Sequence, residues 1–187
     1  MKKQALLVID LQNDYYPGGK WELEGVEEAS QNAAQLIEKA RKDGQLVVHV
    51  QHVNPFVEAP FFVEGTPGAD IHQDVTPIDG EKVVVKQQAN SFRDTNLKKY
   101  LDENGVEKLV ICGAMSHMCV HAATRASADF GYETVVVHDA CATRELEFNG
   151  VSVPAKQVHA AFMAAAGFGY AQLISTKELR LVCMSIV

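Results

Sequence analysis

The chain has 187 residues, a usual length for one domain with a sizeable core, and we expect a single domain over residues 1–187. A hydrophobic fraction of 47% and a charged fraction of 22% are those of an ordinary globular protein. The formal net charge of −7 argues against nucleic acid or an anionic membrane as the main partner, because both reward clustered lysines and arginines.

The N-terminal apolar run is short. It covers residues 5–9 and is ended by Asp10, whereas a secretory signal needs a longer apolar region before a cleavage point. No stretch approaches the ~18 apolar residues expected of a membrane-spanning helix. We therefore expect a soluble, cytoplasmic protein. The four cysteines form no Cys-x-x-Cys pair, which favours free thiols over a zinc site or a disulfide framework.

Short runs rich in branched apolar residues alternate along the chain with segments of helical spacing. This alternation predicts a three-layer α/β/α fold with a central six-stranded, mostly parallel sheet. The predicted strands cover residues 4–9, 46–50, 82–85, 108–112, 134–137 and 171–174. The predicted helices cover residues 27–42, 94–104, 119–130 and 154–166, and Asp94 is the expected cap of the second.

Two segments do not fit this alternation. Residues 53–80 contain four prolines and no helical period, and a loop of that length inside a compact domain is often functional. Residues 179–187 are unexpectedly apolar, and three alternatives stay open for them. This tail could add an edge strand, pack on a partner subunit or be disordered.

Three residues with chemical potential follow predicted strands. Asp10 comes after the first strand, Lys86 after the third, and residues 113–119, ending in Cys119, after the fourth. Ligand sites of such sheets lie at the carboxyl ends of the strands. We therefore expect Asp10, Lys86 and Cys119 to meet at one edge.

These residue types suit thiol chemistry. A cysteine at the start of a helix is favoured as a thiolate by the helix dipole, and Lys86 would add positive charge. Asp10 could accept the thiol proton, and backbone amides of the turn before Cys119 could bind an oxyanion. Taken singly, such residues are more often a packed thiol, a turn residue and a solvated lysine. Their convergence favours a thiol acyl-transfer hydrolase.

Three motifs in register resemble the isochorismatase-like cysteine hydrolases of the nicotinamidase/isochorismatase superfamily. They are residues 10–14 (DLQND) with Pro17-Gly18-Gly19, then Val85-Lys86 with Asn90-Ser91-Phe92, and last Gly113-x5-Cys119-Val120 with residues 124–126 (TRA) and 138–142 (HDACA). The resemblance implies an isochorismatase-like, Rossmann-like fold and an Asp10, Lys86, Cys119 triad. It also implies a cis peptide at Ala114–Met115, an oxyanion hole of Met115 and Cys119, and a homo-oligomer.

Nicotinamidase-like members of this family carry a metal on an Asp-x-His pair after the second strand and a further histidine. The aspartate of that pair is missing here, where the sequence reads Gln51-His52-Val53. We therefore expect no metal and no other cofactor. The alternative is that His49, His52 and His72 gather around an ion.

Aromatic residues on loops at the sheet edge are candidates for binding a small-molecule substrate. We expect Tyr15, Trp21 and Phe62 to form pocket walls, although plain loop anchoring is an equal alternative. Asn90 and His117 are further candidates for contacting substrate. The apolar tail and the aromatic loop predict a homodimer or homotetramer, with residues 53–80 at the contact.

The most specific prediction is cleavage of an amide or related C–N bond in a small molecule. Alternatives are a hydrolase of a non-amide substrate and a non-catalytic binding module on the same fold. A nucleotide-binding Rossmann domain is rejected, because the first strand is followed by residues 10–14 (DLQND) and not by G-x-G-x-x-G.

Overall fold

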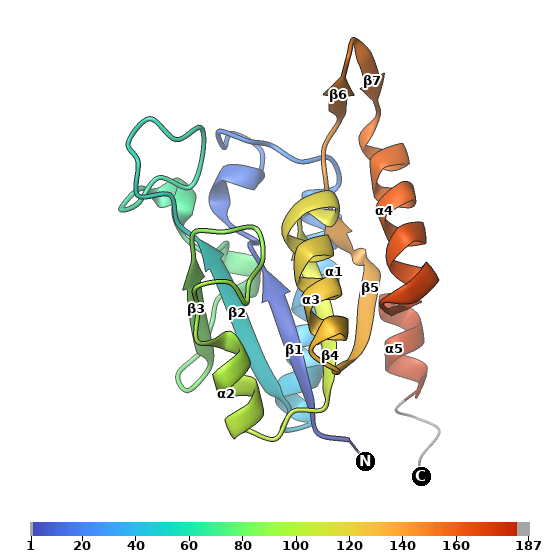
Figure 1. Ribbon diagram of the computed structural model, residues 1–187. Coiled ribbons are helices and arrows are strands. Elements are labelled where there is room, and N and C mark those ends of the chain that lie inside the picture. Colours follow the sequence, from blue (N-terminus) through green and yellow to red (C-terminus); the bar gives the residue numbers. More distant parts are fainter. Residues whose placement is uncertain (1, 183–187) are drawn as a thin grey trace.

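A computed structural model describes residues 2–182 and the side chains of residues 2–179. Its centre is a sheet of six parallel strands in the order β3-β2-β1-β4-β5-β8 (Figure 1). The strands are β1 (Gln4–Ile9), β2 (Leu46–His52), β3 (Lys82–Lys86), β4 (Lys108–Ala114), β5 (Glu133–Ala142) and β8 (Gln172–Ile174). The six predicted strands and the three-layer α/β class are thus confirmed.

Helices cover both faces of this sheet. They are α1 (Val26–Lys42), α2 (Leu97–Glu103), α3 (His121–Asp129), α4 (Ala155–Gly169) and α5 (Thr176–Val182). Side-chain alternation along β1 decides which face each residue serves: Leu6 and Val8 pack in the cluster of α1, and Leu7 and Ile9 in the cluster of α2 and α3. Figure 1 shows α2 and α3 in front of the sheet and α1 behind it. None of the helices in residues 2–182 has the length and apolar character that crossing a membrane requires.

The start of α2 differs from the prediction. The helix begins at Leu97, and Asp94 is not its cap. Asp94 has a φ of 57° and an exposed side chain, and the hydroxyl of Thr95 accepts the N–H of Leu97 at 3.3 Å. The N-cap residue is Asn96, which makes no side-chain capping bond, so the Thr95 hydroxyl just before it supplies a side-chain contact to the first helical N–H.

Two elements were absent from the prediction. A hairpin of β6 (Leu146–Phe148) and β7 (Val151–Val153) projects from the top of the molecule in Figure 1. Helix α5 takes up the first part of the apolar tail, so residues up to 182 add no edge strand, and Leu179 packs against the α1 cluster. Residues 183–187 lie outside the described residues.

Gly113 near the end of β4 is required by its surroundings. Its φ is 122°, and a Cβ at this position would collide with the backbone of Ile9. Glycine therefore lets β4 lie close to β1 just where the two strands end. Asp10 follows one of these ends and the Cys119 turn follows the other.

Candidate active site

A buried carboxylate, that of Asp10, lies at the end of the first strand. Asp10 directly follows β1, and its N–H still donates to the carbonyl oxygen of Val50 at 3.0 Å, which keeps it aligned with β2. Its φ of 50° is left-handed, a conformation that aspartate tolerates better than most residues. The Asp10 side chain is fully buried at the carboxyl edge of the sheet.

Lys86 is the last residue of β3 and lies opposite His52, the last residue of β2. A lysine usually keeps its ammonium in water, but Lys86 is only 2% exposed. Its Nζ lies 2.7 Å from Oδ2 of Asp10 and 3.3 Å from Sγ of Cys119. The buried ammonium therefore joins the carboxylate to the thiol.

Cys119 lies in a π-helical turn, Ser116–Val120, between β4 and α3. The predicted helix over residues 119–130 was wrong at its start, because α3 begins at His121 and the chain is already helical at Ser116. The N–H groups of Met118 and Val120 both donate to the carbonyl oxygen of Met115, which tightens the turn around the cysteine. The peptide bond between Ala114 and Met115 is cis.

The surroundings of Cys119 act on its pKa in both directions. Burial, followed by the negative charge of Asp10, raises the pKa of Cys119 to about 12, although Lys86 lowers it. Burial also opposes the charged form of Lys86, but Asp10 and Cys119 outweigh that effect and raise the pKa of Lys86. Burial of the site therefore opposes the thiolate that Lys86 and the start of the helix are expected to favour.

This arrangement leaves Asp10 able to accept a proton. Its Oδ1 is buried and accepts no hydrogen bond from any described residue. One oxygen of Asp10 and Sγ of Cys119 lie within 4.8 Å of each other. This proximity of the carboxylate to the thiol suits Asp10 to the role of general base.

His52 also belongs to this site, and the sequence reasoning did not place it there. Its Nδ1 lies 2.9 Å from Nζ of Lys86, and the ring is partly buried. The signal that could have found it is positional, because His52 and Lys86 end neighbouring strands. Burial and the positive charge of Lys86 lower the pKa of His52, so its imidazole is neutral at neutral pH.

The three histidines proposed as an alternative metal set do not gather. His49 is buried on β2, and its Nε2 lies 3.0 Å from a carboxylate oxygen of Glu81. His72 stacks on the ring of Tyr16 with 3.5 Å between centroids. His49 and His52 are an odd number of positions apart on one strand, so their side chains leave opposite faces of the sheet.

Three of the predicted substrate-binding residues meet in one aromatic cluster. The rings of Tyr15 and Phe62 are 4.5 Å apart, and Phe61 lies 4.9 Å from both Phe62 and Trp21. Tyr15 and Phe62 are fully buried, whereas Trp21 is partly exposed. Burial and then the charge of Asp10 raise the pKa of Tyr15, which places its phenol within electrostatic range of the triad. The cluster also packs the loop: the N–H of Phe62 donates to the Asp14 carboxylate at 2.7 Å.

The other two predicted contacts, Asn90 and His117, are half-buried. The side-chain oxygen of Asn90 accepts the N–H of Phe92 at 3.0 Å. Nδ1 of His117 lies 2.6 Å from the hydroxyl of Thr143 on the segment after β5. Each of these two side chains is thus held by a hydrogen-bond partner. In the sequence, Asn90 lies four residues after Lys86 and His117 lies two residues before Cys119.

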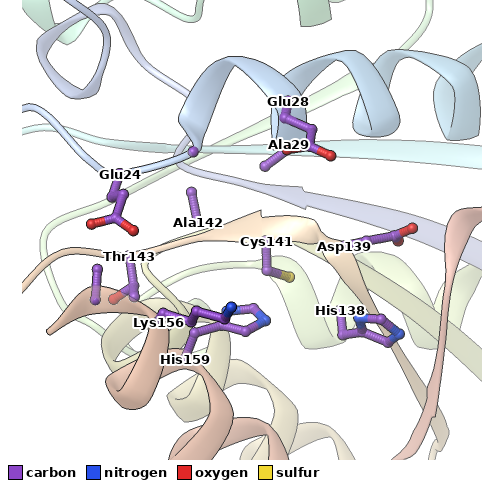
Figure 2. Close-up of a pocket in the computed structure, with 12 residues that line it drawn as sticks. Glu24, Glu28, Ala29, His138, Asp139, Cys141, Ala142, Thr143, Lys156 and His159 are labelled. Atoms are coloured by element: carbon purple, nitrogen blue, oxygen red, sulfur yellow. The ribbon is translucent and has the colours of Figure 1, made fainter.

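A separate cavity of about 350 Å³ lies beside the second half of β5. Figure 2 shows Glu24 and Glu28 on its α1 side and Lys156 and His159 on its α4 side. It opens because β8 pairs only with residues 135–137 of β5. None of the triad residues lines it. Two of its lining side chains contact the nucleophile turn: Nδ1 of His159 lies 2.8 Å from the hydroxyl of Ser116, and the hydroxyl of Thr143 lies 2.6 Å from Nδ1 of His117.

A parallel sheet that brings a cysteine, an aspartate and a lysine together at its carboxyl edge defines the class of thiol-containing α/β hydrolases. A family model for the isochorismatase domain matches residues 4–172. The chain belongs to the isochorismatase family and is a hydrolase.

Relatives and solved structures agree with this assignment. The uncharacterized isochorismatase family protein YddQ of Bacillus subtilis is 49% identical over 173 residues, 92% of this chain and 96% of that protein. A solved structure assigned to the isochorismatase hydrolases, from Oleispira antarctica, has a TM-score of 0.91 at 55% identity and covers 95% of this chain and 96% of its own.

Two more distant relatives have named activities. A streptothricin hydrolase of Streptomyces noursei is 39% identical over 148 residues, 76% of this chain and 51% of that protein. The maleamate amidohydrolase of Pseudomonas putida is 34% identical over 157 residues, 76% of this chain and 74% of that protein.

Proposed function

We propose that this hydrolase cleaves an amide or related C–N bond of a small molecule through a thioester on Cys119. The observation that carries the proposal is the contact of one buried ammonium, Lys86, with both the Asp10 carboxylate and the Cys119 sulfur. The maleamate amidohydrolase among the relatives supports the amide as the bond that is broken.

In the proposed acylation one proton passes from Cys119 to Asp10 and then from Asp10 to the leaving group. The Cys119 thiol gives its proton to Asp10, and the sulfur attacks the substrate carbonyl carbon. The carbonyl oxygen takes up the electron pair, and the backbone N–H groups of Met115 and Cys119 are proposed to stabilise it. Protonated Asp10 then gives the proton to the leaving nitrogen, which departs as ammonia or an amine and leaves a thioester.

Deacylation repeats these steps with water. Asp10 takes a proton from the water molecule, whose oxygen attacks the thioester carbonyl, and the proton passes to the departing sulfur. The products are a carboxylic acid and the free thiol. Lys86 keeps its proton throughout and balances the negative charge that passes between Asp10 and the sulfur.

The proposed substrate pocket uses the aromatic cluster as its floor. Trp21, the partly exposed member of the cluster, would contact the apolar part of a small substrate, with the fully buried Tyr15 and Phe62 packed behind it. Asn90 and His117 would contact its polar groups. This assignment rests on position, because the three aromatic residues form one cluster near Asp10 and the other two flank Lys86 and Cys119 in the sequence.

A panel of small amides, carbamates and ureides, with a vinyl ether as the non-amide member, tests the proposal. We expect release of ammonia or amine from at least one C–N substrate. Rapid acid quenching should trap an acyl group on the peptide that contains Cys119, detected by mass spectrometry. Turnover of the vinyl ether alone, or turnover without a trapped acyl group, would contradict the proposed reaction.

We also propose that the protein is a homodimer or homotetramer. Phe56 and Val57 on the loop of residues 53–80 are 70% and 81% exposed, and Phe148 and Phe168 are exposed elsewhere. Large apolar side chains at the surface favour a contact between subunits. Light scattering at micromolar concentration should give at least twice the chain mass of 20.5 kDa, and a monomeric mass would contradict the proposal.

A further inference from the structure

We infer that His52 is a positioning residue for Lys86: it accepts a hydrogen bond from the ammonium and holds it between Asp10 and Cys119. His52 would fix the orientation of the Lys86 ammonium and would not itself contact the substrate. The inference rests on the proposed function only in taking Lys86 to be part of the reactive site.

The first argument is the geometry around Nζ of Lys86. The ammonium has three N–H donors and no acceptor. Three acceptor atoms lie within hydrogen-bond distance of Nζ: Oδ2 of Asp10 at 2.7 Å, Nδ1 of His52 at 2.9 Å and Sγ of Cys119 at 3.3 Å. Each donor therefore has one acceptor. A lysine without the His52 contact would have one N–H unused and more freedom to rotate away from the sulfur.

The second argument is the tautomer that this contact requires. Because the ammonium only donates, Nδ1 of His52 must be the unprotonated nitrogen, and the ring proton must lie on Nε2. Nε2 lies 3.3 Å from the side-chain oxygen of Asn54, which can accept that proton. The amide nitrogen of Asn54 in turn donates to the carbonyl oxygen of Phe61 at 2.7 Å, so its oxygen faces His52.

These contacts form one chain from the aromatic loop to the thiol. It runs from the Phe61 carbonyl through Asn54 and His52 to Lys86, and from there to Cys119. The ring of Phe62 lies 6.1 Å from that of His52. The position of the loop that carries Phe61 and Phe62, which is proposed to bind substrate, is thus linked through hydrogen bonds to the orientation of the Lys86 ammonium.

A metal site is the competing interpretation of the same donors. One ligand atom from each of Asp10, His52 and Cys119 lies within 4.8 Å of the others, as in a three-ligand cation site. The ammonium of Lys86, however, already contacts all three side chains. The lysine ammonium therefore occupies the position that a bound metal ion would take among these three side chains.

The charges around His52 agree with a neutral ring. The charged or titratable groups that face it are Lys86 from β3, Asp10 after β1 and Cys119 from the nucleophile turn. A protonated His52 would place a second cation against Lys86 and would lose its acceptor nitrogen. The contact therefore belongs to the neutral pH range and is lost in acid.

The test compares His52→Leu, which removes the acceptor, with His52→Asn, whose side-chain oxygen can take roughly the place of Nδ1. The readout is the rate of Cys119 alkylation by iodoacetamide at pH 8, which needs no substrate. We expect a loss of about tenfold or more in His52→Leu, as for a lost hydrogen bond to a charged group, and recovery of most of the rate in His52→Asn. His72→Asn is the matched control and should alkylate like the parent protein.

A second measurement keeps the inference testable if His52→Leu fails to fold. Two-bond ¹H–¹⁵N correlation spectra of the parent protein at neutral pH should show His52 protonated on Nε2 only. A proton on Nδ1, or a Lys86→Met variant that alkylates slowly while His52→Leu does not, would overturn the role of His52. Alkylation that depends on both residues, in a protein inactive on every C–N substrate, would instead overturn the proposed function and leave this inference standing.

Discussion

Replacing Cys119 with alanine should lower turnover of an identified substrate by at least ~10⁴-fold, because the variant has no atom to carry the acyl group. The trapped adduct on the Cys119 peptide should disappear as well. Steady-state rates and intact-protein mass spectrometry measure the two effects.

Cys112→Ala is the matched control, since it removes a buried sulfur from the neighbouring strand β4 and leaves the triad in place. It should retain turnover and the acyl adduct. If Cys119→Ala kept more than a few per cent of the parent rate while Cys112→Ala did not, Cys119 would not be the nucleophile.

Changing Asp10 and Lys86 should move thiol reactivity in opposite directions. The negative charge of Asp10 raises the pKa of Cys119, so Asp10→Asn should lower that pKa and speed alkylation at a fixed pH between 7 and 9. The positive charge of Lys86 lowers the pKa of Cys119, so Lys86→Met should raise it further and slow alkylation. Turnover should nevertheless fall in both, by ~10²-fold or more in Asp10→Asn, because the general base is lost.

Iodoacetamide kinetics against pH, run beside substrate turnover, measure this divergence. Removing one partner of a buried ion pair costs about 3–5 kcal/mol of folding stability, so thermal unfolding must be followed in parallel. An Asp10→Asn protein that is folded, alkylates faster and still turns over at the parent rate would show that Asp10 is not the base.

Local signals in the sequence predict most of the fold. Most strands of the sheet contain a run of branched apolar residues, and the apolar spacing of α1 places Ala33, Leu36 and Ile37 against the sheet. The hairpin of β6 and β7 was missed although its turn is Asn149-Gly150, a typical two-residue hairpin signal, because the flanking strands are only three residues long. The start of the Cys119 helix was missed because a π-helical turn has no apolar period to mark it.

The triad could be predicted because strand ends converge in a parallel sheet, and this needs no side-chain detail. The direction in which the pKa of Cys119 is shifted could not be predicted, because it depends on how deeply the turn is buried and how close Asp10 lies. His52 was placed with His49 and His72 by residue type alone. Its partner, Lys86, is brought beside it only by the pairing of β2 with β3.

The burial of Cys119, which is only 6% exposed, also bears on oxidation of its sulfur. Peroxides attack the thiolate, and a protonated sulfur in a buried site enters the path through sulfenic to sulfonic acid slowly. In the proposed mechanism the sulfur becomes a thiolate only when its proton has passed to Asp10, and bound substrate would cover it at that moment. Oxidants therefore have little access to this sulfur in either state of the site, because the fold covers it when the site is empty and the substrate would cover it during the reaction.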